Sequence, residues 1–87
     1  MGYAYQKQVL RQRYGNRCML CERVLKKDKQ SYHHRQPKAC DGRATIENGA
    51  IICMQCQRII HLFDYGTEPY TLLDERIEKN MNKYKRY

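Results

Sequence analysis

Four cysteines in two C-x-x-C pairs are the strongest chemical signal in the sequence. Cys18 and Cys21 form the first pair, and Cys53 and Cys56 form the second pair after a long intervening segment. Four thiolates in two such pairs suit tetrahedral zinc, because a gap of two residues lets both sulfurs of a pair reach one ion from a tight turn. The sequence therefore predicts one structural zinc site. Two dithiols with a redox or packing role are the alternative, and the fifth cysteine, Cys40, matches neither pair.

Three histidines form a second group of residues with chemical potential. His33 and His34 are adjacent and lie between the two cysteine pairs, and His61 follows the second pair. One imidazole can bind a metal ion while a neighbouring one acts as a base near neutral pH. A metal ion and a base on either side of a phosphate is the arrangement that phosphodiester hydrolysis needs. Surface histidines without a function are the alternative.

Short helices and strands must position these cysteines and histidines. Hydrophobic spacing, glycines and prolines indicate where each element begins and ends. The predicted elements are a helix over about residues 3–14, a strand over 32–35, a short buried strand over 50–52, a helix over about 53–64 and a last helix over about 71–86.

The last two predicted helices each have an expected core face. In the helix over about residues 53–64, the expected core face consists of Ile59, Ile60 and Phe63. Gly66 and Pro69 are expected to end this helix. The last helix is expected to begin with a capping pattern at Thr71. Its predicted apolar stripe consists of Leu73, Ile77, Met81 and Tyr84.

Length and composition limit what can hold the fold together. A chain of 87 residues with one Phe and no Trp has a thin core, so one small domain with a metal staple is expected. The absence of an 18-residue apolar run and of an apolar segment near Met1 predicts no membrane span, no secretory signal and a reducing, cytoplasmic location. Seventeen Lys and Arg against nine Asp and Glu give a formal charge of +8, which favours a polyanionic partner, nucleic acid before an anionic membrane.

The order of these motifs resembles that of the HNH endonucleases, most of all the short zinc-knuckle members common in bacteriophages and mobile elements. The resemblance covers about residues 9–64 and leaves the C-terminal helix outside. It implies an α+β fold: a small, zinc-stapled, treble-clef-like ββα-metal domain with flanking N- and C-terminal helices, and a single domain over residues 1–87. The matching residues are Cys18, Cys21, His33-His34-Arg35-Gln36-Pro37-Lys38, Asn48, Ile51-Ile52-Cys53, Cys56 and Ile60-His61.

The resemblance also implies roles for individual residues. The activity would be metal-dependent hydrolysis of DNA phosphodiester bonds, leaving 5′-phosphate and 3′-hydroxyl ends. His34 would be the general base, and His33 and His61 would be ligands of the catalytic ion, Mg²⁺ or Mn²⁺, with Ni²⁺ or Zn²⁺ as alternatives. Asn48 would brace the loop that aims His34 through a hydrogen bond to the backbone, and Arg35 would contact a phosphate.

One position departs from the family pattern. After the last knuckle cysteine the family usually has His or Asn, and this chain has Gln57. Gln57 lies one helical turn before His61, so both side chains share a helix face and Gln57 can be a further ligand. The departure indicates either a tolerant Mg²⁺ or Mn²⁺ site or a weakened one.

Basic residues near the predicted site provide for binding of DNA. Arg35, Lys38 and Arg43 can contact phosphates, which gives salt-sensitive and sequence-blind affinity. The charged C-terminal tail is interpreted as a solvated helix face. A second hypothesis, favoured by Gln57, is an HNH-like zinc module without catalysis that binds nucleic acid or a host or phage protein. A third is an accessory protein of phage DNA packaging that works beside a terminase.

Overall fold

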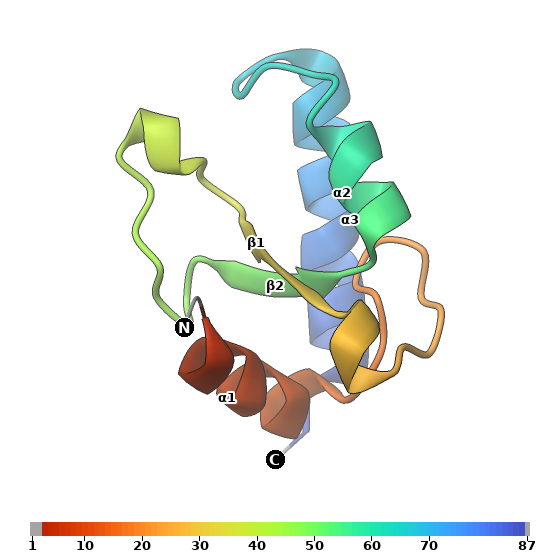
Figure 1. The fold of residues 1–87 in the computed structure, drawn as a ribbon. Coiled ribbons are helices and arrows are strands. Elements are labelled where there is room, and N and C mark those ends of the chain that lie inside the picture. The colour runs from red at the N-terminus through yellow and green to blue at the C-terminus, as the bar shows by residue number, and fades with distance from the viewer. Residues whose placement is uncertain (1–2, 87) are drawn as a thin grey trace.

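A two-stranded hairpin with helices on both faces forms the fold in the computed structural model, which describes residues 3–86 (Figure 1). The zinc-stapled α+β class expected from the sequence is confirmed, with three α-helices, two antiparallel strands and a four-cysteine cluster that can hold a metal ion. The elements are α1 (Ala4–Tyr14), the 3-10 turn η1 (Lys27–Lys29), β1 (Ser31–His34), the 3-10 turn η2 (Lys38–Cys40), β2 (Gly49–Ile52), α2 (Met54–Ile60) and α3 (Glu68–Tyr84).

The antiparallel pair β1 and β2 is the centre of the molecule. Its register pairs Ser31 with Ile52 at one end and His34 with Gly49 at the other. All four residues of β2 are buried, because α1 packs against one face of the hairpin while α2 and α3 lie across the other (Figure 1). The lack of a side chain at Gly49 makes room for the Tyr32 ring, because a Cβ at Gly49 would come within 2.3 Å of that ring.

One apolar core connects the helices to the hairpin. Leu10 of α1, Ile52 of β2, Ile60 of α2 and Ile77 of α3 are each at most 1% exposed. The expected stripe of α3 is confirmed, because Ile77 and Met81 are buried while Leu73 and Tyr84 pack against the core. The expected end of α1 is also confirmed: Gly15 caps it with φ +85°, and its N–H donates to the carbonyl of Arg11.

The expected second helix is too long, and its expected core face is wrong. Helix α2 ends at Ile60. The N–H groups of Leu62 and Phe63 donate three residues back, to the carbonyls of Ile59 and Ile60, so the chain tightens and leaves the helix axis. Only Ile60 of the predicted face is buried. Ile59 is 47% exposed and Phe63 is 38% exposed, because no element covers their side of the short helix.

The last helix begins earlier than the sequence predicted. It starts at Glu68 after Thr67, so Thr71 lies inside the helix and does not cap it. Pro69 was expected to close the preceding element, yet it occupies the first turn of α3. Proline is compatible with that position because the first amides of a helix have no intrahelical acceptor. Among residues 3–86, no helix is both long and apolar enough to cross a membrane.

Helix α3 is attached to the first cysteine pair by one buried hydrogen bond. The Asn80 side chain, 5% exposed, donates from Nδ2 to the carbonyl of Met19 at 2.8 Å. Met19 in turn donates its N–H to the carbonyl of Ile51 in β2. This chain of bonds connects α3, the first knuckle and the hairpin.

We expect Asn80→Ala to lower the free energy of unfolding by about 1–3 kcal/mol, because it leaves a buried carbonyl without a donor. Urea unfolding measures the change. Asn82→Ala is the matched control, since Asn82 is exposed on the same helix. Equal stability of the two variants would contradict this role of Asn80.

Candidate functional site

The two adjacent histidines lie on opposite faces of β1, as alternation along a strand requires. His33 faces α2 and α3, with ring centroids 6.1 Å from His61 and 6.5 Å from Tyr70. His34 faces the start of α1, where its ring makes edge-on contacts with Tyr3 at 5.3 Å and Tyr32 at 4.9 Å. The last residue of the strand is His34, so the backbone is free to turn immediately after it.

His33 is enclosed and neutral at physiological pH. Its exposed fraction is 1%, and burial, together with the nearby His61, lowers the pKa of its imidazole to about 4. Asp74 and the Gln57 amide act in the opposite direction, and their effect is smaller. A neutral imidazole has a free lone pair at pH 7, which a metal ligand requires.

Three buried polar atoms have no hydrogen-bond partner among the described residues. They are both ring nitrogens of His33 and Oε1 of Gln57. Gln57 and His61 lie one turn apart on the same face of α2, and the N–H of His61 donates to the carbonyl of Gln57. Buried polar groups are almost always satisfied in native proteins, so a group of buried polar atoms without partners marks a place for a missing ligand.

The Asn48 side chain holds together the loop that follows His34. Its Oδ1 accepts from the N–H of Gln36 at 2.8 Å, and its Nδ2 donates to the carbonyls of Gln36 and Arg43. The backbone continues the same connection, because the N–H of Arg35 donates to the carbonyl of Asn48. Asn48 thus ties both ends of the connection between β1 and β2.

Helix α3 contributes residues that the sequence reasoning missed. The Arg35 guanidinium makes two bonds to the Asp74 carboxylate, at 2.9 and 3.1 Å, and a third to Glu78 at 3.4 Å. Tyr70 donates its hydroxyl to the Arg35 carbonyl at 2.7 Å. The only sequence signal for this contact was the spacing of four between these helix residues, which places them on one face.

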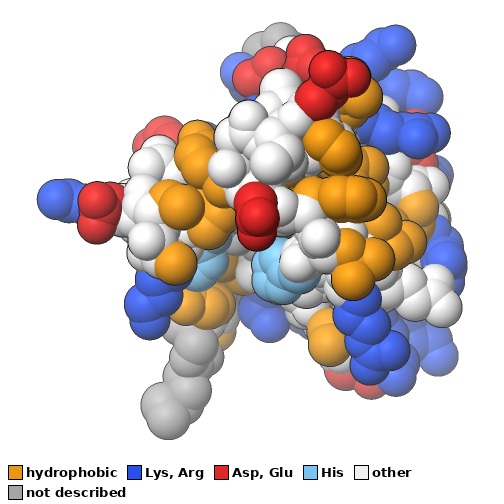
Figure 2. All heavy atoms as spheres, turned by 90° about the horizontal axis from the view of Figure 1, so that it is seen from above, with side chains coloured by type: hydrophobic (Ala, Val, Ile, Leu, Met, Phe, Trp, Pro, Cys, Tyr) orange, Lys and Arg blue, Asp and Glu red, His pale blue; other side chains and the backbone are white. Residues whose placement is uncertain are grey.

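The remaining predicted residues lie around His34. Lys38 is exposed, and its charge adds to burial in lowering the pKa of the His34 imidazole. Arg43 is exposed in the loop that Asn48 braces. In Figure 2, histidine side chains reach the surface at two separate places on one face, with hydrophobic and acidic side chains around them and most Lys and Arg at the margins.

The four predicted knuckle cysteines lie together, away from the histidines. The sulfurs of Cys18, Cys21, Cys53 and Cys56 are all within 4.8 Å of one another, so this cluster can hold a metal ion. Backbone amides donate to the sulfurs, among them the N–H of Cys53 to Cys18 Sγ at 3.3 Å. Burial raises the pKa of Cys18 and Cys56, and a cation bound in the cluster would favour their thiolate forms. Cys40 is exposed and lies outside the cluster.

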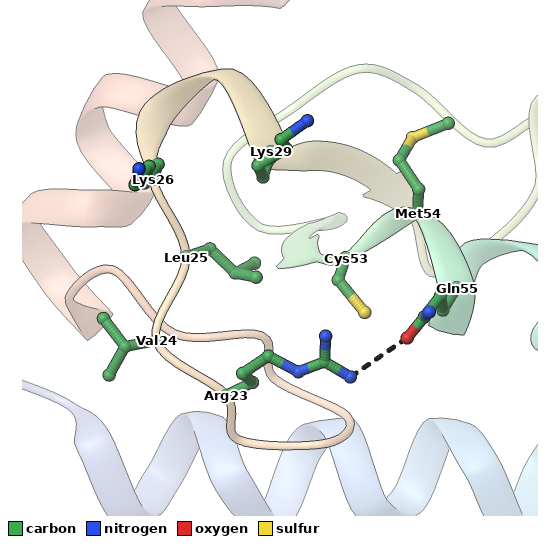
Figure 3. Close-up of a pocket in the computed structure, with 8 residues that line it drawn as sticks. All are labelled: Arg23, Val24, Leu25, Lys26, Lys29, Cys53, Met54 and Gln55. Atoms are coloured by element: carbon green, nitrogen blue, oxygen red, sulfur yellow. Dashed lines mark hydrogen bonds between the residues drawn. The ribbon is translucent and has the colours of Figure 1, made fainter.

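A pocket of about 410 Å³ opens beside this cluster, next to the loop that follows the first cysteine pair (residues 23–26) (Figure 3). Leu25 and Cys53 point into it, and Arg23 crosses it to donate to Oε1 of Gln55 at 3.0 Å. The pocket contains none of the histidines. The candidate reactive centre is the space between β1, α2 and α3 together with the end of β1 at His34, and the cysteine cluster is a separate candidate metal site.

Comparison with known proteins agrees with this arrangement. A model of the HNH endonuclease family matches residues 18–62, just over half of the chain, from the first knuckle cysteine to the residue after His61. A search of curated proteins finds no match. With the cysteine cluster and the paired histidines in the matched segment, the chain belongs to the HNH endonuclease family.

Proposed function

We propose that the protein is a metal-dependent endonuclease that hydrolyses DNA phosphodiester bonds. The observation that carries this proposal is the buried His33 ring. Its two nitrogens and Oε1 of Gln57 have no hydrogen-bond partner in the part of the chain that the structure describes, and the centroid of the His61 ring lies 6.1 Å from that of His33. These groups are of the types that coordinate a divalent metal ion, and they would fill part of its coordination shell. Family membership supports a nuclease-type chemistry for it.

The donor set fits a divalent cation. Two imidazole nitrogens and one amide oxygen are neutral ligands, and water or phosphate oxygens can complete the shell. We propose His33, His61 and Gln57 as the ligands, with Mg²⁺ or Mn²⁺ as the ion and Ni²⁺ or Zn²⁺ as alternatives. A bound cation would supply stabilisation of the negative charge that develops on the phosphate.

His34 is the proposed general base. Edge-on contacts with Tyr3 and Tyr32 orient its ring, and its lowered pKa keeps the imidazole neutral, and thus able to accept a proton from water, at pH 7. The Asn48 side chain bonds to the backbone of Gln36, two residues after His34, so the strand end that carries His34 has a defined position.

Lys38 and Arg43 are proposed phosphate contacts, because both are exposed near His34. Arg35 was proposed for the same role, and in this structure its guanidinium is bound by Asp74 and Glu78. A phosphate would have to compete with two carboxylates for it, so Arg35 acts first as the link between β1 and α3. We also propose a cytoplasmic location, from the sequence near Met1 and the cysteine usage, and a bacterial or phage-infected cell with a terminase partner, from the resemblance.

The proposed structural metal is Zn²⁺ in the cysteine cluster, with one ion per chain. We expect Cys53→Ser to unfold the domain and to abolish zinc content, because ion binding supplies folding energy that the thin core lacks. Elemental analysis and circular dichroism measure the two effects. Cys40→Ser is the matched control and should change neither. A folded protein that contains no zinc would contradict the assignment.

The second test concerns the base. We expect His34→Ala to reduce plasmid nicking by roughly 10²–10⁴-fold, because it removes proton transfer. His34→Gln should be as slow, although it nearly preserves the side-chain volume. Circular dichroism and DNA binding should stay at wild-type levels.

The same assay gives the expected pH dependence. Only neutral His34 can accept a proton, so the rate should rise with pH through the His34 pKa, which lies below its ordinary value of 6.5, and stay level at neutral pH. Wild-type nicking by His34→Ala, or a rate that falls between pH 5 and 7, would remove His34 from this role.

The third test concerns the departure at Gln57. An imidazole binds transition metals more tightly than an amide oxygen, so Gln57→His should tighten Mn²⁺ or Ni²⁺ binding and raise nicking at low metal concentration. Isothermal titration and nicking rates measure both. Gln55→His is the control, because Gln55 is exposed on the same helix and bonds to Arg23.

The two outcomes for wild type separate the alternatives. If the wild type nicks DNA with Mg²⁺ or Mn²⁺, the site is an active one. If the wild type fails to nick DNA with any divalent ion and only the Gln57→His variant is active, the protein is a binding module that has kept the HNH shape. No effect of Gln57→His on affinity or rate would place Gln57 outside the metal shell.

A further inference from the structure

A polar groove lies at the end of the molecule away from the candidate reactive centre. It has a volume of about 510 Å³ and is bordered by the second half of α1, the turn after it, η1 and the C-terminal end of the chain. In Figure 1 these segments lie on the opposite side of the hairpin from the C-terminal end of α2, which carries His61. The lining residues are Gln8, Arg11, Gln12, Asn16, Lys27 and Arg86. Three are cations and three are amides, and none is acidic or apolar.

The C-terminal wall of the groove is held in place by the turn after α1. The N–H of Arg86 donates to the carbonyl of Arg13 at 2.6 Å. The Arg86 guanidinium lies against Gly15, where a Cβ would come within 2.9 Å of its Nη2. Gly15 thus serves both the positive φ of the helix cap and the close approach of a charged side chain.

Arg11 is oriented by a buried amide. Its Nη1 donates to Oε1 of Gln30 at 3.2 Å, and Gln30 is 5% exposed. Gln30 is itself fixed, because its Nε2 donates to Oδ1 of Asn16 at 3.0 Å and to the carbonyl of Leu25. This support is neutral, so the positive charge of Arg11 remains uncompensated while its direction is set.

No carboxylate among residues 3–86 forms an ion pair with Arg11, Lys27 or Arg86. The hollow beside the candidate reactive centre has the opposite character. Glu47 and Asp74 line it, and Arg35, its only cation, is already paired. The groove therefore offers three cations without a carboxylate partner, whereas the cation of the hollow beside His33 is neutralised.

We propose that this groove binds the phosphodiester backbone of a nucleic acid. The three cations can contact phosphates, and the amides of Gln8, Gln12 and Asn16 can donate to phosphate and sugar oxygens. The lining has no aromatic or apolar side chain for a base, so contact is independent of sequence. The groove lies across the hairpin from His61, and it therefore adds affinity for DNA and takes no part in cleavage. The inference shares with the proposed function only the nucleic-acid partner.

The test compares two variants that each lose two positive charges. Lys27→Gln with Arg86→Gln removes two groove cations. Arg76→Gln with Lys79→Gln removes two exposed cations of α3 that lie near Glu22 and Glu75. Fluorescence anisotropy measures the affinity of the full chain for a labelled duplex of about 20 base pairs between about 50 and 200 mM salt, without added divalent cation.

We expect the groove variant to bind the duplex roughly five- to tenfold more weakly than the α3 variant, and the slope of log Kd against log salt to fall by about two, one for each lost phosphate contact. Equal affinity and slope for the two variants would overturn the proposal, and so would a wild type that does not bind the duplex. Groove-dependent binding to phosphatidylserine vesicles without binding to DNA would assign the groove to a membrane surface instead.

The failure of this proposal can be told from that of the nuclease. If the wild type binds duplex through the groove but never nicks it, the groove assignment stands and the endonuclease assignment fails. If the wild type nicks DNA and the groove variant keeps wild-type affinity and KM, the endonuclease assignment stands and the groove assignment fails. With both correct, the groove variant should show a raised KM and an unchanged kcat.

Discussion

The constraint on which the structure depends is the meeting of four cysteine sulfurs from two distant segments. Cys53 directly precedes α2, and its sulfur accepts from the N–H of Cys56, so the cluster fixes where the helix starts. The start of a helix determines which way every later side chain points. Gln57 and His61 face His33 because the helix is phased from the cysteine cluster. The core around the cluster is too small to fix that phase by packing alone.

The second organising feature is the alternation of side chains along β1. A strand sends neighbouring residues to opposite faces, which gives two adjacent histidines different surroundings. His33 is buried against α2 and α3 and is suited to bind an ion. His34 is half-buried at the strand end and packs edge-on against the stacked rings of Tyr3 and Tyr32. A doublet on one strand thereby provides two chemical environments, and the closing loop, tied by Asn48, brings the strand to an end at the second of them.

The charge around His33 differs from the charge of the groove at the other end of the molecule. Around the histidines, Asp74 and Glu78 neutralise Arg35, and Glu47 lines the neighbouring hollow. An acidic surround favours a divalent cation, whereas it opposes the approach of phosphates. The uncompensated cations of Arg11, Lys27 and Arg86 lie across the hairpin. In this interpretation the groove adds affinity for nucleic acid to the contacts proposed for Lys38 and Arg43 near His34, and α3 orders the side of the hairpin that carries His33.

The sequence by itself determined three features of the protein. The core stripe of α3 follows from spacing along one segment, and the cysteine cluster follows from two C-x-x-C pairs that together complete one tetrahedral site. The fold class followed from the order of the motifs, which resembles that of a known family. Spacing also showed that Gln57 and His61 share a face. Only the tertiary structure decided the rest. Ile59 and Phe63 are exposed because burial depends on what covers a helix, and periodicity does not record the covering element. Arg35 binds Asp74 and Glu78, and Arg86 lies on Gly15, because chain segments distant in sequence meet. A contact between such segments leaves no local pattern, so no reading of one segment at a time could have found it.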